Sequence, residues 1–153
     1  MRSALPYTRL LLAFCAFLLS APGAMSSNQA KHYQSDAMAK LNLPFSEAVI
    51  VGDLLFLSGQ LGNKPGTAQL APGGIAAETR QAIDNIGAVL QANGSSFDRI
   101  IRCTVFLADI KEWPAFNEVY VSYFEPPYPA RSAAAVSGLA LGARVEIECI
   151  AYR

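Results

Sequence analysis

The sequence predicts a single α+β domain in which strands and two helices follow one another in the order ββαβαββ. A length of 153 residues suits one domain with a core of its own. Two apolar runs at residues 48–51 and 54–58 are separated by Gly52-Asp53, a pair typical of the tight turn of a β-hairpin. Two later segments repeat their apolar residues at the helical period, and strand-like runs separate and follow them. We therefore expect one sheet with both helices packed on one of its faces.

The first helix is expected from residue 75 onward, after a loop that contains Pro65-Gly66 and Pro72-Gly73-Gly74. Its apolar positions recur every three or four residues, and Asn93-Gly94 provides a stop signal. The helix is therefore amphipathic and packs through one side.

The second helix is expected to begin at Trp113-Pro114, since proline is tolerated in a first helical turn. Before it, residues 101–108 are rich in β-branched and aromatic side chains and predict a buried strand. Aromatic residues then recur at helical spacing until Pro126-Pro127. Such an aromatic stripe is more often part of a core than a binding face.

The last two strands are expected at residues 132–136 and 144–152. In the final strand, Arg144, Glu146 and Glu148 alternate with apolar residues and should share one face of the sheet. With 52% hydrophobic residues and few charges on the strands, the face without helices is expected to be covered by further copies of the chain.

The N-terminal residues 1–26 have the order of a secretory signal peptide: Arg2 and Arg9, then an apolar run over residues 10–19, then small residues. The run is shorter than the twenty or so residues that span a bilayer, so a permanent anchor is the weaker interpretation, as is a lipoprotein modified at Cys15. We expect export to the periplasm or the medium, with a cleavage position that the sequence leaves open. Residues 27–40 are polar and unpatterned, predicting a flexible lead-in, and residues 41–153 form the domain.

Charge and metal-ligand content exclude two classes of partner. After the leader the chain has ten basic and twelve acidic residues, and no basic patch, so nucleic acid is not an expected partner. The single histidine, His32, offers no zinc site.

Cys103 and Cys149 can pair in an oxidising compartment, but buried free thiols are the favoured interpretation, because cross-strand disulfide geometry is demanding.

Arg131 and Glu146 are the candidate reactive residues. Arg131 follows Pro129-Ala130, so its backbone is stiff while its planar guanidinium can bind a carboxylate in a bidentate way. Glu146 can take a proton from a water molecule. By spacing alone, the alternative of an exposed arginine in a weak ion pair stays open.

The chain resembles the RidA (YjgF) family of reactive-intermediate deaminases from Pro44 to Arg153. The resemblance is carried by motifs in a fixed order: Ser58-Gly59-Gln60, Thr104-Val105-Phe106, Phe116-Asn117-Glu118, Pro129-Ala130-Arg131-Ser132 and Val145-Glu146-Ile147-Glu148. It implies a chorismate-mutase-like fold, a homotrimer around a barrel of sheets, and three sites in the clefts between subunits. It also implies hydrolysis of 2-imino acids, such as 2-iminopropanoate and 2-iminobutanoate, to 2-keto acids and ammonia, without a cofactor or metal.

By this resemblance, Arg131 holds the substrate carboxylate and Glu146 lies near the hydrolytic water, while Ser58 and Gly59 line the same cleft. The chain departs from the family pattern at two substrate-contacting positions. Phe45 stands where the family often has tyrosine, which removes a hydroxyl and bears on rate and substrate preference. Ala133 stands where cysteine is frequent, but its backbone carbonyl is retained. The alternatives are a non-catalytic exported trimer that binds a small carboxylate, and a structural or interaction protein.

Overall fold

The structure is a computed structural model that describes residues 29–153. These residues form a seven-stranded sheet. Its strands are β1 (Lys31–Tyr33), β2 (Ala48–Val51), β3 (Leu54–Leu57), β4 (Gln60–Leu61), β5 (Ile100–Leu107), β6 (Ala130–Ala135) and β7 (Val145–Tyr152). The helices are α1 (Asp36–Ala39), α2 (Gly74–Ala92) and α3 (Trp113–Val121), with 3-10 turns η1 (Phe97–Arg99), η2 (Ile110–Glu112) and η3 (Ala140–Gly142). The predicted leader lies outside the described residues.

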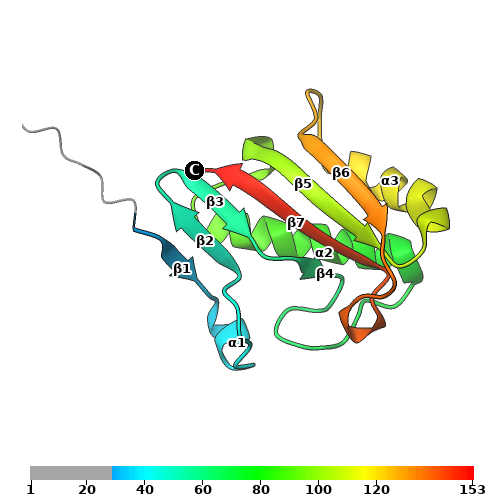
Figure 1. Ribbon diagram of the computed structural model, residues 1–153, viewed down its shortest axis with the longest axis horizontal. Helices are drawn as coiled ribbons and strands as arrows, with labels where there is room; N and C mark the ends of the chain where they lie inside the picture. The colour runs from blue at the N-terminus through cyan, green and yellow to red at the C-terminus, as the bar shows by residue number, and fades with distance from the viewer. Residues whose placement is uncertain (1–28) are drawn as a thin grey trace, which may run out of the picture.

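Strand β7 occupies the centre of the sheet (Figure 1). The strand order is β1-β2-β3-β7-β5-β6, and the short β4 also pairs with β7. Neighbouring strands are antiparallel except for β5 and β6, which are parallel and joined through α3. A parallel pair needs such a crossover because a short turn cannot return the chain to the same end of the sheet.

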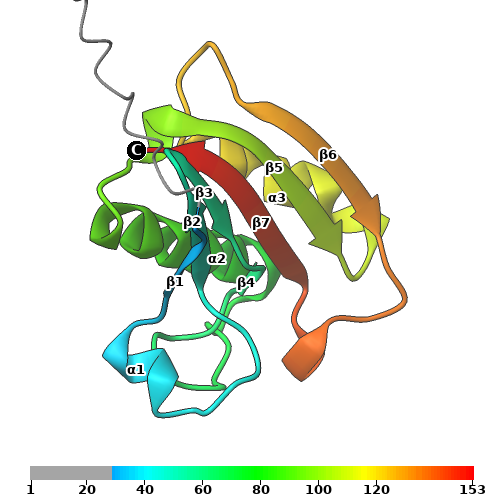
Figure 2. The same ribbon diagram turned by 60° about the vertical axis from the view of Figure 1, so that its left-hand side comes forward.

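Helices α2 and α3 cover one face of the sheet, as predicted (Figure 2). The core between the layers is built from fully buried side chains of both, including Leu55, Ile83, Val105, Phe116 and Ile147. On the opposite face, which we call the open face, Leu54, Phe56 and Tyr152 are 40–47% exposed. The alternation of buried and exposed residues along β3 and β7 reflects the period of two that sorts side chains to the two faces.

The elements predicted for the central part of the chain are confirmed. The hairpin is β2–β3, the two helices are α2 and α3, and β5 and β7 match the predicted strands within one residue. Strand β6 begins at Ala130, two residues before the predicted start, so Arg131 lies within the strand.

The flexible lead-in predicted for residues 27–40 is wrong from residue 31 onward. Residues 31–33 form β1, which pairs with β2 along its length, and α1 follows directly. The buried carboxylate of Glu47 accepts a hydrogen bond from the Ser35 backbone N–H at 2.5 Å, and the Ser35 side chain caps α1. A three-residue edge strand is too short to show a period in the sequence.

Candidate functional site

Arg131 is held in a cage of aromatic rings from α3. Its Cζ atom lies 4.5 Å from the centroid of the Tyr120 ring, 5.3 Å from that of Trp113 and 5.7 Å from that of Phe116. Its Nη2 donates a 2.9 Å hydrogen bond to Asn117 Oδ1, also on α3. Stacking on aromatic faces favours a guanidinium, and the hydrogen bond fixes its rotation. The arrangement orients the cation while the Asn117 amide is its one hydrogen-bond partner among the described residues.

Two aromatic residues of α3 serve both the core and the cage around Arg131. Phe116 and Tyr120 are buried, as predicted, and they also form walls around the guanidinium. The Tyr120 hydroxyl is buried without a hydrogen-bond partner in the described part of the chain, and burial raises the pKa of this phenol. The motif Phe116-Asn117-Glu118 contains Asn117, but the sequence does not reveal its contact with Arg131, because that contact depends on how β6 packs under α3.

Glu146 lies on β7 and turns to the open face, against Gly59. A Cβ atom at Gly59 would come within 2.0 Å of Glu146 Oε1, so the carboxylate occupies the space that any other side chain would need. Burial is the main cause that raises the pKa of Glu146, and the nearby charge of Glu148 raises it further. A carboxylate with a raised pKa is a stronger base than an ordinary glutamate, which suits proton transfer from water.

Within one chain the structure does not bring Arg131 and Glu146 together. Arg131 is in register with Cys103, whose side chain is buried on the helix face, whereas Glu146 is in register with Phe106, on the open face. The two residues are two strands apart and offset by three positions, so their Cα atoms are separated by about 14 Å from strand spacing and rise. Their side chains leave the sheet on opposite sides.

The remaining predicted site residues divide between these two regions. Ala133 lies on β6 with Arg131, and its side chain packs against the core. Ser58 lies beside Gly59, but its hydroxyl donates a 2.6 Å hydrogen bond to the Ser46 carbonyl, which gives it a structural partner. Phe45 is 46% exposed on the loop between α1 and β2, and it lines the same cavity as Gly59.

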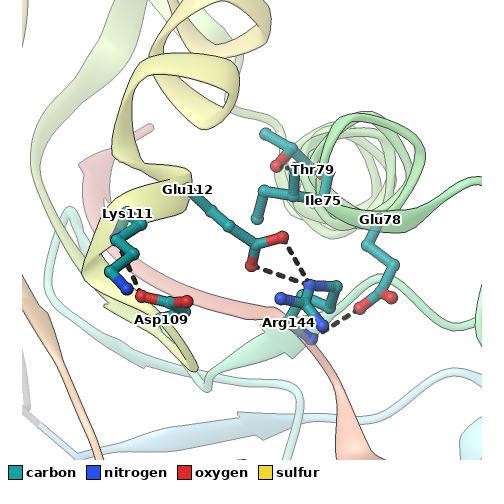
Figure 3. A network of polar contacts seen from close by, with 7 residues as sticks. All are labelled: Ile75, Glu78, Thr79, Asp109, Lys111, Glu112 and Arg144. Atoms are coloured by element: carbon teal, nitrogen blue, oxygen red, sulfur yellow. Dashed lines mark hydrogen bonds and ion pairs between the residues drawn. The ribbon is translucent and has the colours of Figure 1, made fainter.

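The start of β7 is fixed by a polar network between the helices (Figure 3). Glu78, which is buried on α2, accepts a 2.8 Å hydrogen bond from the Arg144 backbone N–H. The Arg144 side chain forms an ion pair with Glu112 at 2.6 Å. Arg144 is thus separated from Glu146 and Glu148, with which the sequence had grouped it. The network anchors the backbone two residues before Glu146.

Cys103 and Cys149 form a disulfide, so the expectation of free thiols is wrong. The two residues are directly opposite each other on the antiparallel strands β5 and β7, with Cα atoms 4.1 Å apart. The predicted alternation placed both side chains on the buried face, but the register that makes them neighbours follows from the tertiary pairing of strands 46 residues apart.

Residues 29–153 contain no group of three or more His, Cys, Asp or Glu side chains that could hold a metal ion. Over the same range, no helix has the length and apolar character needed to cross a membrane.

The sequence and the fold both match known proteins. The model of the Endoribonuclease L-PSP family matches residues 35–153. Relatives named 2-iminobutanoate/2-iminopropanoate deaminase are 48% identical in Bos taurus and 44% identical in Homo sapiens, each over 110 residues that cover 72% of this chain and 80% of the relative. The crystal structure of RidA from an Antarctic Psychrobacter is 40% identical with a TM-score of 0.69, covering 72% of this chain and 89% of that one. The chain therefore belongs to the Endoribonuclease L-PSP family, the family of the RidA (YjgF) proteins.

Proposed function

We propose that this protein hydrolyses reactive 2-imino acids to 2-keto acids and ammonia. The observation that carries the proposal is the guanidinium of Arg131, which three aromatic rings and Asn117 hold ready for an anionic ligand. The deaminase names of relatives at 44–48% identity support the same reaction. The ten basic and twelve acidic residues after the leader speak against the RNA cleavage that the family's description names.

The reaction needs orientation and one proton carrier. Arg131 binds the substrate carboxylate through two parallel N–H donors and so fixes the imine carbon. Glu146 takes a proton from a water molecule while the water oxygen forms a bond to that carbon. That proton passes to the nitrogen and gives a carbinolamine. Glu146 then takes the hydroxyl proton and delivers it to the amino group, so that the carbon–oxygen double bond forms as the carbon–nitrogen bond breaks and ammonia leaves. Every proton and electron is supplied by the imine, the water and these two side chains.

The site is completed by a second copy of the chain, in a homotrimer. Its support is the separation of Arg131 and Glu146 on opposite faces of one sheet, together with the exposed apolar side chains Leu54 and Phe56 on the open face. When the open face of one subunit packs against its neighbour, Glu146 of the first subunit can face Arg131 of the second. A homotrimer with cyclic symmetry repeats this contact three times.

The protein functions outside the cytoplasm. The support consists of two independent features, the signal-peptide pattern of residues 1–26 and the disulfide between Cys103 and Cys149. Disulfides form and persist in oxidising compartments and are rare in the cytosol.

The decisive experiment couples an amino acid oxidase to the purified protein and follows imine loss with alanine and 2-aminobutanoate as oxidase substrates. We expect Arg131→Ala to lower kcat/KM roughly thirty-fold to several thousand-fold, the effect of removing one partner of a buried charge pair. Arg131→Lys should restore little, since lysine lacks the planar fork. The matched control is Arg80→Ala, because Arg80 is an exposed arginine on α2.

Two outcomes would contradict the proposal. Imine loss at the rate of the oxidase alone, with 2-keto acids still binding in calorimetry, would favour the non-catalytic carboxylate binder. Unchanged kinetics for Arg131→Ala in a protein of unchanged mass and circular dichroism would remove Arg131 from the site.

A further inference from the structure

A second feature of the fold, distinct from the aromatic cage, is a large apolar cavity near Glu146. It has a volume of about 600 Å³ and lies between α1, the loop that follows β4, the second half of α2 and η3. Figure 2 shows α1 and the loop after β4 at the same end of the sheet. The cavity is lined by exposed apolar side chains, among them Leu41, Leu43, Phe45 and Leu141, which are 38–55% exposed. Side chains of this kind are usually buried against a partner or a ligand.

Two polar side chains on the cavity wall, Asn85 and Glu47, are already bonded to the protein. The Asn85 side chain donates to the carbonyls of Leu61 and Asn63 at 3.1 and 2.9 Å, and its oxygen accepts from Gln81 at 2.9 Å. The carboxylate of Glu47 accepts the Ser35 N–H. A ligand in this cavity is therefore held by apolar contact, and its own carboxylate would be repelled by Glu47.

The cavity adjoins the proposed catalytic carboxylate. Gly59 and Gln60 form part of its wall, and the Glu146 carboxylate lies against Gly59 on the side where a Cβ would be. Gly59 therefore borders both the cavity and the carboxylate. A substrate whose imine carbon faces Glu146 thus has its side chain within reach of the cavity, while its carboxylate points away from Glu47.

We propose that this cavity receives the substrate side chain, so that the enzyme favours 2-imino acids with large apolar side chains, of the leucine and phenylalanine type. The inference rests on the proposed imine hydrolysis and adds its substrate class. A methyl group fills a small part of 600 Å³, whereas an isobutyl or benzyl group can contact Leu43 and Phe45. Phe45 then contributes an apolar wall at a position where the resemblance leads one to expect a hydroxyl.

The expected preference for large imines follows from the apolar side-chain surface that the substrate buries in the cavity. Each buried methylene favours binding about fourfold, so three additional carbons favour the leucine-derived imine over the alanine-derived imine by up to about sixtyfold in kcat/KM. A ratio of about ten or more is sufficient to distinguish a filled cavity from an unused one.

The test compares imines that an oxidase generates from alanine, leucine and phenylalanine, using the purified native oligomer. The wild-type protein should give a kcat/KM ratio of leucine-derived to alanine-derived imine of about ten or more, and 4-methyl-2-oxopentanoate should inhibit more strongly than pyruvate. Ala88→Leu fills the cavity from α2 and should lower that ratio about tenfold. The matched control is Ala92→Leu, at the exposed end of the same helix, which should keep the wild-type ratio.

The outcomes separate this inference from the function on which it rests. If alanine-derived imine is hydrolysed at least as efficiently as the larger imines, the inference is overturned and imine hydrolysis stands. If no imine is consumed faster than with the oxidase alone, imine hydrolysis itself fails and the inference fails with it. If Ala88→Leu changes the oligomer mass in light scattering, the cavity is covered by a second copy of the chain, which also overturns the inference.

Discussion

Mixed oligomers of two inactive variants test whether each site is shared between two copies of the chain. In one chain, Arg131 and Glu146 lie on opposite faces of the sheet, about 14 Å apart by strand spacing and rise. Arg131→Ala retains a usable Glu146, and Glu146→Gln retains a usable Arg131. Each pure variant is expected to be nearly inactive. When the two are combined in one oligomer, an intact Arg131 of one copy can meet an intact Glu146 of its neighbour.

The recovered activity follows from counting neighbours around a ring. In a mixed trimer, whether two copies are of one variant or of the other, one of the three clefts joins an intact Arg131 to an intact Glu146. Purified mixed trimers should therefore recover about one third of the wild-type kcat, whereas a mixed cyclic dimer would recover about one half. A site contained within a single chain would recover none, because every copy lacks one of the two residues.

The assay co-expresses the two variants with different affinity tags, and two successive purifications select the mixed oligomers. Light scattering gives the oligomer mass, and coupled oxidase kinetics give kcat. As a control, Arg131→Ala is co-expressed with the double variant Arg131→Ala/Glu146→Gln, which leaves no copy with an intact Arg131. Mixed oligomers of the two single variants that stay at the control level would refute the shared site and the assembly proposed from it.

Four further predictions concern Glu146 and its neighbour Glu148, the glycine that Glu146 packs against, and the disulfide. Glu148→Gln removes a like charge that raises the pKa of Glu146, so the acidic limb of the pH dependence of kcat/KM should move to lower pH; an unmoved limb would assign it to another group. Because the folded-state pKa of Glu146 is raised, its stabilising effect is complete at low pH and is lost as pH rises through that pKa. Glu146→Gln should therefore raise the midpoint of urea unfolding at neutral pH and leave it unchanged in acid. Gly59→Ala places a Cβ atom 2.0 Å from Glu146 Oε1 and should lower kcat on the order of a hundredfold with unchanged circular dichroism; full activity would show that the carboxylate can move without loss. Reduction of the disulfide, which closes a separation of 46 residues, should lower the free energy of unfolding by about 4 kcal/mol on the chain-entropy model, and Cys103→Ala/Cys149→Ala should be insensitive to reductant; a wild-type urea midpoint that reductant does not shift would contradict this.

Local patterns in the sequence were sufficient for most of the elements. Gly52-Asp53 between two apolar runs predicted the β2–β3 hairpin, and Trp113-Pro114 predicted the start of α3. Turn chemistry and helix capping depend on residues a few positions apart, so they are legible in a single sequence. The helices on one face followed from the same patterns, because each strand and helix must bury its apolar side.

Features that depend on strand register could not be predicted from local sequence patterns. The pairing of Cys103 with Cys149 requires β5 to lie beside β7 with a particular register, and so does the placement of Arg131 and Glu146 on opposite faces. A shift of one residue moves every side chain of a strand to the other face, and the sequence alone does not exclude it. The aromatic cage has the same origin, since the stripe on α3 surrounds a guanidinium only because β6 places Arg131 beside it.

The central position of β7 sets the order in which the chain can fold during synthesis. Strands β1–β3 make one antiparallel group, and β5 and β6 make a parallel pair, but within the described sheet β7 joins these two groups. The ribosome must therefore reach residue 152 before the sheet can close. Until then each group exposes an unpaired strand edge, and the contacts that close the sheet span much of the chain. A nascent chain of this design therefore completes its sheet only once nearly all of its residues have been made.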